Sequence, residues 1–175
     1  MLRSLVGSEM CIRDSFERVL ESARRYGRHA AVLYVDLDGF KSVNDQWGHA
    51  AGDLLLQQVA RRLEDCVRAE DTVARLGGDE FGIVLATIER ADHCEVVAGK
   101  VLSAMEQPFV LEGAVAHISA SVGAALYPRH GADADALLAQ ADAAMYAAKQ
   151  AGKNRFNIDT ASVSYTHLRA HETPE

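Results

Sequence analysis

Three carboxylates are the residues of this chain whose type and position could do chemistry. Asp36 follows an uninterrupted apolar run at residues 30–35, and Asp79 and Glu80 follow two consecutive glycines. Such a run is typical of a central strand covered on both faces, and a bare carboxylate buried at its end would cost several kcal/mol. One aspartate after a strand is usually a turn or capping residue. Three carboxylates converging beside a Gly-Gly turn instead predict a binding site.

The expected ligand of these carboxylates is a divalent cation. Oxygen ligands without His or Cys favour Mg²⁺ or Mn²⁺, and either ion can bridge the phosphates of a nucleotide. A net negative chain that binds a polyphosphate also needs local cations or a metal.

The elements that position the carboxylates follow from hydrophobic periodicity. A helix is expected at 16–27, a short helix ends near 48, and longer helices are expected at 52–67, 95–105 and 133–151. Strands are expected at 30–35, 72–76, 81–85, 117–127 and 155–158, with a hairpin turn at the glycines. This order predicts an α+β fold of the ferredoxin-like kind, in which helices flank a central, mostly antiparallel five-stranded sheet.

Composition restricts the class of protein. The 175 residues are 49% hydrophobic, with 18 Lys and Arg against 25 Asp and Glu and a formal charge of −7, which suits one globular domain and disfavours nucleic-acid binding. No apolar run approaches the roughly 20 residues that span a bilayer. Cys11, Cys66 and Cys94 show no metal-ligand spacing and indicate a reducing compartment. We expect a cytoplasmic domain without membrane contact, whatever anchors its parent protein.

The sequences of the two chain ends do not resemble natural protein sequence. Residues 5–15 can be written in codons that resemble a transposase-type sequencing-library adapter, and the reverse complement of that adapter encodes residues 163–172 in another frame. We interpret residues 1–15 and 163–175 as translated adapter. The genuine domain is then expected at residues 16–162, shortened at its N-terminal side.

The blocks around the carboxylates carry a family resemblance. Residues 75–81, Arg-Leu-Gly-Gly-Asp-Glu-Phe, resemble the signature of the GGDEF family of diguanylate cyclases, which join two GTP into cyclic di-GMP with loss of two pyrophosphates. Five further blocks occur in the family's order, at residues 36–41, 44–45, 48–53, 121–123 and 141–154. The resemblance runs from Phe16 to Ile158 and implies the nucleotidyl-cyclase palm form of the expected fold.

The resemblance also implies a role for each matching residue. Asp36 and Asp79 would bind the metals through carboxylates and Leu37 through its carbonyl. Glu80 would be a further metal ligand or take part in proton removal. Lys41 would meet the phosphates and offset transition-state charge, which suits phosphoryl transfer.

Other positions correspond to the substrate pocket. Phe40, Asn44 and Asp53 would bind GTP, Asn44 and Asp53 by reading its guanine. A carboxylate only accepts hydrogen bonds and guanine offers an N1 and N2 donor pair, although Asp53 could also cap a helix. Lys149 and Lys153 are four residues apart near a helix end, so we expect both to clamp the triphosphate. The family usually has Arg at position 153.

Arg68 and Asp71 match the RxxD inhibitory site of the family, in which Arg68 would donate two hydrogen bonds to a product phosphate and Asp71 would bind a guanine. Alone, this pattern is often an exposed ion pair. The second arginine of that site has no equivalent, because Gly99 and Lys100 stand in its region.

Three functions remain open at this point. The leading one is a Mg²⁺-dependent diguanylate cyclase that works as a homodimer with one GTP per subunit and is inhibited by its product. The second is a module that senses GTP or cyclic di-GMP without turnover and regulates a neighbouring domain. The third, a polymerase-like palm, is disfavoured by the acidic charge.

Overall fold

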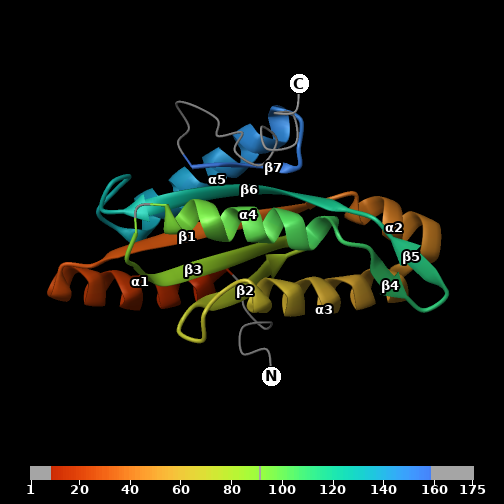
Figure 1. Cartoon of the computed structure of the whole chain (residues 1–175), viewed down its shortest axis with the longest axis horizontal. Coiled ribbons are helices and arrows are strands. Elements are labelled where there is room, and N and C mark those ends of the chain that lie inside the picture. The colour runs from red at the N-terminus through yellow and green to blue at the C-terminus, as the bar shows by residue number, and fades with distance from the viewer. Residues whose placement is uncertain (1–8, 91, 159–175) are drawn as a thin grey trace.

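The computed structural model describes residues 9–90 and 92–158, and its centre is a five-stranded sheet (Figure 1). The strand order is β2-β3-β1-β6-β7. β7 runs parallel to β6, and the other neighbours are antiparallel. The strands of this sheet are β1 (His29–Asp38), β2 (Thr72–Gly77), β3 (Glu80–Ile88), β6 (Ser119–Tyr127) and β7 (Arg155–Asn157). The predicted α+β fold with a mostly antiparallel five-stranded sheet is therefore confirmed.

Helices cover both faces of the sheet (Figure 1). One face packs against α3 (His49–Asp65) and α4 (His93–Glu106), and the other packs against α1 (Glu9–Tyr26) and α5 (Ala134–Gln150). The short helix α2 (Phe40–Trp47) follows β1 directly. The result is a three-layer arrangement whose two hydrophobic cores meet at the sheet.

Strand β1 divides its side chains between these two cores. Alternate residues of a strand point to opposite faces, so Leu33 and Val35 enter the core with α3 and α4, while Val32 and Tyr34 enter the core with α1 and α5. The predicted burial of this strand on both faces is confirmed. By the same alternation Asp36 and Asp38 lie on the α1 and α5 face.

Two details differ from the sequence-based expectation. β1 continues to Asp38 instead of ending at residue 35, because its last residues still pair with β6. A small hairpin of β4 (Phe109–Leu111) and β5 (Ala114–Ala116) was not predicted. Its strands have three residues each, too few for alternation to be visible in the sequence.

The predicted boundary at Phe16 falls inside a helix. α1 begins at Glu9, and Ile12 is fully buried beside Gly82 of β3. Residues 1–8 and 159–175 lie outside the described residues, so the adapter origin of the two ends stays a prediction. In the part of the chain that is described, no helix is long and apolar enough to cross a membrane.

We expect Gly123→Ala to destabilise the fold. A methyl group at residue 123 of β6 would overlap the backbone of α5 at Ala141 and Met145, so the helix would have to move away from the sheet. Overpacking of this kind costs about 1–3 kcal/mol. Urea denaturation followed by circular dichroism measures the change in the free energy of unfolding.

Gly99→Ala is the matched control, because no atom lies within 4 Å of a methyl group built at this position of α4. Replacing a helical glycine by alanine should stabilise the domain by about 0.5–1 kcal/mol. Equal effects of the two substitutions would contradict the close approach of α5 to β6.

Candidate active site

Asp36 is paired on both sides within the sheet. It lies opposite Glu80 of β3 and opposite Ser121 of β6, and it is 9% exposed. Burial raises the pKa of Asp36 above its ordinary value, and the charge of Asp79 raises that pKa further, while a hydrogen bond from Lys149 opposes the shift. The sheet thus holds a carboxylate in a place where its charge is costly, which is common at functional sites.

The glycine turn brings Asp79 to this carboxylate. Gly78 and Asp79 connect β2 to β3, and Gly78 has a φ of 50°, which favours glycine. The guanidinium of Arg75 donates two hydrogen bonds to the carbonyl of Gly78, at 2.8 and 3.1 Å. The amide of Leu37 donates to the carbonyl of Asp79 at 3.1 Å. The turn is therefore fixed against the end of β1, as the sequence predicted.

Two observations bear on a divalent cation at this site. Asp36 Oδ1 is buried and has no hydrogen-bond partner among the described residues, whereas buried polar atoms nearly always have one. The described residues contain no group of three or more His, Cys, Asp or Glu that could hold a metal by themselves. Two carboxylates and the Leu37 carbonyl fit Mg²⁺ that shares its coordination with substrate phosphates, which is the usual arrangement for this ion.

A second buried carboxylate, Asp38, was missed by the sequence analysis. It is 7% exposed and accepts hydrogen bonds from the hydroxyls of Ser119 and Ser121, at 2.9 and 3.0 Å. It also accepts from the Lys149 ammonium at 3.1 Å and from the amide of Asn154 at 3.2 Å. The signal was present, because residues two apart on a strand share a face, but the strand was expected to end too early.

Lys149 joins the two carboxylates. Its Nζ lies 3.1 Å from Asp36 Oδ2 and 3.1 Å from Asp38 Oδ1. Burial lowers the pKa of Lys149, but the hydrogen bonds to Asp38 and Asp36 outweigh that effect, so the net pKa is raised. The lysine therefore stays charged at neutral pH, between Asp36 and Asp38.

The structure places Lys149 in the last turn of α5 and Lys153 beyond the helix. α5 ends at Gln150, and Lys153 lies in the following turn with a φ of 65°. Its side chain is exposed. Lys41 is also exposed and lies in the first turn of α2, directly after β1. Both lysines are accessible to a ligand, and their contact with phosphate stays a prediction.

The residues expected to read guanine lie where α2 meets α3. The Asn44 amide packs against Gly52, where a methyl group would overlap Asn44 Oδ1. That oxygen is buried without a hydrogen-bond partner among the described residues. Asp53 follows Gly52 and is exposed, and its side chain is not the N-cap of α3, which begins at His49. Phe40, half-buried, packs against the core at the start of α2.

Asp71 of the expected inhibitory site already has a structural role. Its carboxylate is 3% exposed and accepts from the amides of Arg68 and Ala86, both at 2.9 Å. The Arg68 side chain is exposed, and its guanidinium lies 3.9 Å from Glu70. The structure therefore leaves the Arg68 guanidinium accessible and ties Asp71 to the loop after α3 and to β3.

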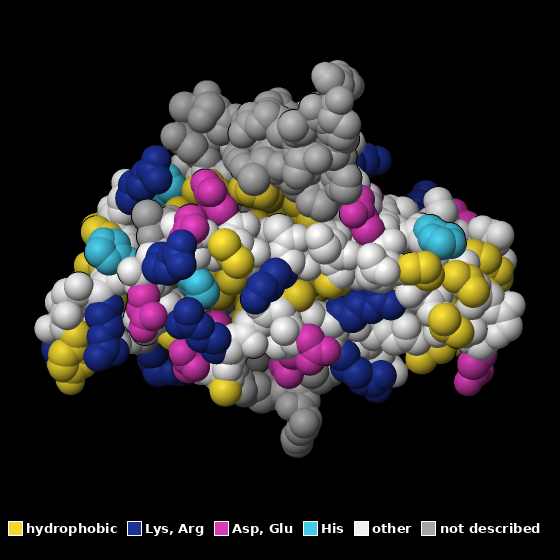
Figure 2. Space-filling view, viewed as in Figure 1, with side chains coloured by type: hydrophobic (Ala, Val, Ile, Leu, Met, Phe, Trp, Pro, Cys, Tyr) yellow, Lys and Arg dark blue, Asp and Glu magenta, His cyan; other side chains and the backbone are white. Residues whose placement is uncertain are grey.

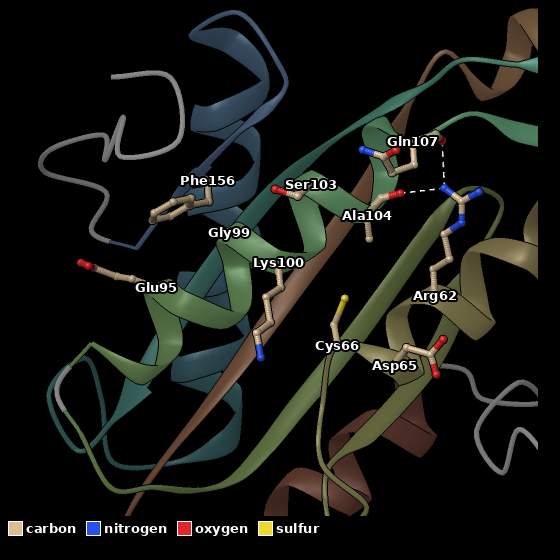
Figure 3. Close-up of a pocket in the computed structure, with 10 residues that line it drawn as sticks. All are labelled: Arg62, Asp65, Cys66, Glu95, Gly99, Lys100, Ser103, Ala104, Gln107 and Phe156. Atoms are coloured by element: carbon tan, nitrogen blue, oxygen red, sulfur yellow. Dashed lines mark hydrogen bonds between the residues drawn. The ribbon is translucent and has the colours of Figure 1, made fainter. Parts of the chain in front are cut away.

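A cavity of about 770 Å³ lies between α3, α4 and β7 (Figure 3). Gly99 and Lys100 of α4 line it, and the Lys100 and Cys66 side chains both extend into the space between the two helices. Arg62 forms one wall and donates to the carbonyls of Ala104 and Gln107, at 2.7 and 2.8 Å. Lys100 therefore supplies a cation in the region where the sequence lacks the second arginine.

We expect Asp36→Asn to stabilise the metal-free domain at neutral pH. The folded pKa of Asp36 is raised, so below the ordinary value both states are protonated and the group has no effect. As pH rises, the unfolded chain ionises first and folding becomes less favourable. Removing the charge should therefore raise the free energy of unfolding at pH 7 in a chelator. The gain should shrink as pH falls towards 4, and a pH-independent or negative change would contradict it.

Comparison with known proteins agrees with this geometry. The family model described as diguanylate cyclase, GGDEF domain, matches residues 7–155. The bifunctional diguanylate cyclase/cyclic di-GMP phosphodiesterase MucR of Pseudomonas aeruginosa is 46% identical over 149 residues, which are 85% of this chain and 22% of MucR. Other similar proteins are named cyclic di-GMP phosphodiesterases. The chain spans less than a third of the length of these curated relatives.

Solved structures show the same fold. The crystal structure of the GGDEF domain of TpbB from Pseudomonas aeruginosa has a TM-score of 0.84 and 36% identity, and the match covers 87% of this chain and 96% of that one. A microbial GGDEF domain whose interaction with cyclic di-GMP has been described has a TM-score of 0.74 and 31% identity, over 86% and 89% of the two chains. The chain belongs to the GGDEF family of diguanylate cyclase domains.

Proposed function

We propose that this domain is a diguanylate cyclase that condenses two GTP into cyclic di-GMP and two pyrophosphates. The observation that carries the proposal is the pair of unsatisfied buried oxygens, Asp36 Oδ1 and Asn44 Oδ1. They belong to residues expected at the two ends of GTP, the phosphates and the guanine. Other buried oxygens without partners occur at Asn154 and Asn157, so the argument rests on this pair together with family membership.

The side chains divide the work of the reaction. Mg²⁺ or Mn²⁺, when bound, would neutralise phosphate charge and polarise the α-phosphate. Asp36, Asp79 and the Leu37 carbonyl would hold it, and Glu80 would add a ligand or accept the proton of the attacking hydroxyl. Lys41, Lys149 and Lys153 would offset the negative charge of the triphosphate. Asn44, Asp53 and Phe40 would orient the base.

One subunit supplies only half of the reaction. Each 3′-hydroxyl attacks the α-phosphate of the other GTP, so a bond from phosphorus to that oxygen forms while the bond to pyrophosphate breaks. Two domains, each with one GTP, must therefore face each other. We propose that the homodimer is the active form and that the monomer binds GTP without turnover.

A sensing module is the second candidate, and a specific observation favours keeping it. The segment similar to this chain also occurs in proteins named as phosphodiesterases, such as one in Escherichia coli that is 42% identical over 129 residues. A palm acting on nucleic acid has less support. On the face shown in Figure 2, basic and acidic side chains are interspersed and form no continuous basic stripe.

Asp79→Ala should abolish cyclic di-GMP synthesis in a domain fused to a forced dimeriser. The substitution removes a metal-binding carboxylate from a turn, where it contributes little packing, so we expect a loss of more than about 100-fold in turnover without a change in thermal unfolding. Chromatographic detection of cyclic di-GMP from GTP and Mg²⁺ measures it.

Glu112→Ala is the control, because Glu112 is an exposed acid in the turn of the β4–β5 hairpin. It should leave turnover unchanged. Full activity of Asp79→Ala would refute the metal assignment. GTP binding without product in the wild-type dimer would favour the sensing module.

Arg68→Ala should weaken the binding of cyclic di-GMP at the proposed inhibitory site by about tenfold, because a guanidinium that forks a phosphate makes charge-assisted hydrogen bonds. Asp71 is unsuitable for this test, since its removal would break two backbone contacts. Calorimetric titration of cyclic di-GMP into each variant measures the affinity.

Arg61→Ala, which removes an exposed arginine of the preceding helix α3, is the matched control and should bind like wild type. Equal affinity of Arg68→Ala and wild type, or no binding to either, would reduce the Arg68 motif to a surface ion pair.

A further inference from the structure

The Asp38 carboxylate connects several segments of the site through hydrogen bonds. The four groups that donate to its carboxylate come from three segments, namely the two serines of β6, the ammonium of Lys149 in α5, and the amide of Asn154 after α5. A buried carboxylate with this many donors is strongly oriented. It is therefore a fixed point around which the neighbouring segments are arranged.

The contacts of Asp38 bracket the turn that follows α5. Lys149 is held at one end of this turn and Asn154 at the other, and Lys153 lies between them. The turn is closed internally by the Lys153 amide, which donates to the Ala148 carbonyl at 3.1 Å. Movement of Asp38 would thus shift the ammonium of Lys149 and the backbone that carries Lys153.

The geometry also limits what Asp38 itself can do. Its carboxylate is buried and occupied by protein donors, whereas Asp36 keeps one oxygen free of such donors in the described structure. An ammonium has three N–H donors. Asp36 and Asp38 take two of those of Lys149, which leaves the third for a phosphate oxygen.

We propose that Asp38 is a positioning residue that presents Lys149, and through Asn154 the turn with Lys153, to the triphosphate of the bound nucleotide. The inference rests on the proposed function, because it takes GTP as the ligand. Asp38 makes no contact with the nucleotide. Its effect is transmitted by the two lysines, and it should be confined to the phosphate end of the ligand.

The test measures binding to the full chain as a monomer, in which no turnover is expected. Calorimetry gives the dissociation constants of GTP and guanosine, with Mg²⁺ present, for wild type, Asp38→Asn, Lys149→Met and the double variant. Asp38→Asn should weaken the binding of GTP by about tenfold, as expected for loss of a charge-assisted contact. The affinity for guanosine, which lacks phosphates, should change by less than about twofold.

Coupling between the two residues separates positioning from general damage. If Asp38 acts through Lys149, adding Asp38→Asn to the Lys149→Met variant should lower its affinity for GTP by much less than the same substitution lowers that of wild type. Asn157→Ala is the stability control, since Asn157 is buried in β7 and donates to the carbonyl of Ala144 in α5 rather than contacting the lysine. It should lower thermal stability and leave GTP affinity within about twofold.

Each outcome decides the matter. Unchanged GTP affinity in Asp38→Asn, an equal loss for guanosine, or full additivity with Lys149→Met would overturn the inference. If Asp38→Asn fails to fold, Ser121→Ala replaces it in the test. This substitution keeps the charge of Asp38 but removes hydrogen bonds that orient its carboxylate. It should weaken GTP binding by about threefold and leave guanosine binding unchanged. Absence of GTP binding by wild type would refute the proposed function instead.

Discussion

The site depends on burying two acidic side chains at the end of the central strand of the sheet. Asp36 and Asp38 point to the same side of β1 and are nearly inaccessible to water, and bare burial of either would be prohibitive. Lys149 meets both, and the serines of β6 satisfy the second. One oxygen of Asp36 therefore has no hydrogen-bond donor among the described residues and is available for a ligand. Asp38 accepts hydrogen bonds only from the protein and serves to hold the structure.

The sheet order explains how these groups meet. β1 lies between β3 and β6, so its end is flanked by the glycine turn on one side and by the serines on the other. β7 is parallel to β6, which requires α5 to cross back over the sheet. The C-terminal end of α5 must then arrive where β6 begins. Lys149 reaches the carboxylates because of this crossover.

Much of this arrangement was predictable from the sequence. The apolar run before Asp36 fixed the central strand, and the two glycines located the turn that carries Asp79. Asp38 was missed because two charges seemed to mark the end of a strand, whereas pairing with β6 continues through them. The helix end expected at residue 151 is close to the observed end at Gln150, whereas the contact of the Asn154 amide with Asp38 beyond that end is a tertiary effect that the sequence does not show. Likewise, only the structure reveals that Asp71 is buried and bonded to two backbone amides, and so has a structural role.

The long separation between the partners of Asp38 bears on how the domain folds. Lys149 and Asn154 are 111 and 116 positions away along the chain, so their contacts close very large loops and contribute late to folding. During synthesis β1 emerges long before these two partners, so its two acidic side chains lack Lys149 and Asn154 until almost the whole domain has left the ribosome. The ion pairs of Lys149 with Asp36 and Asp38 can form only when α5 docks on the sheet.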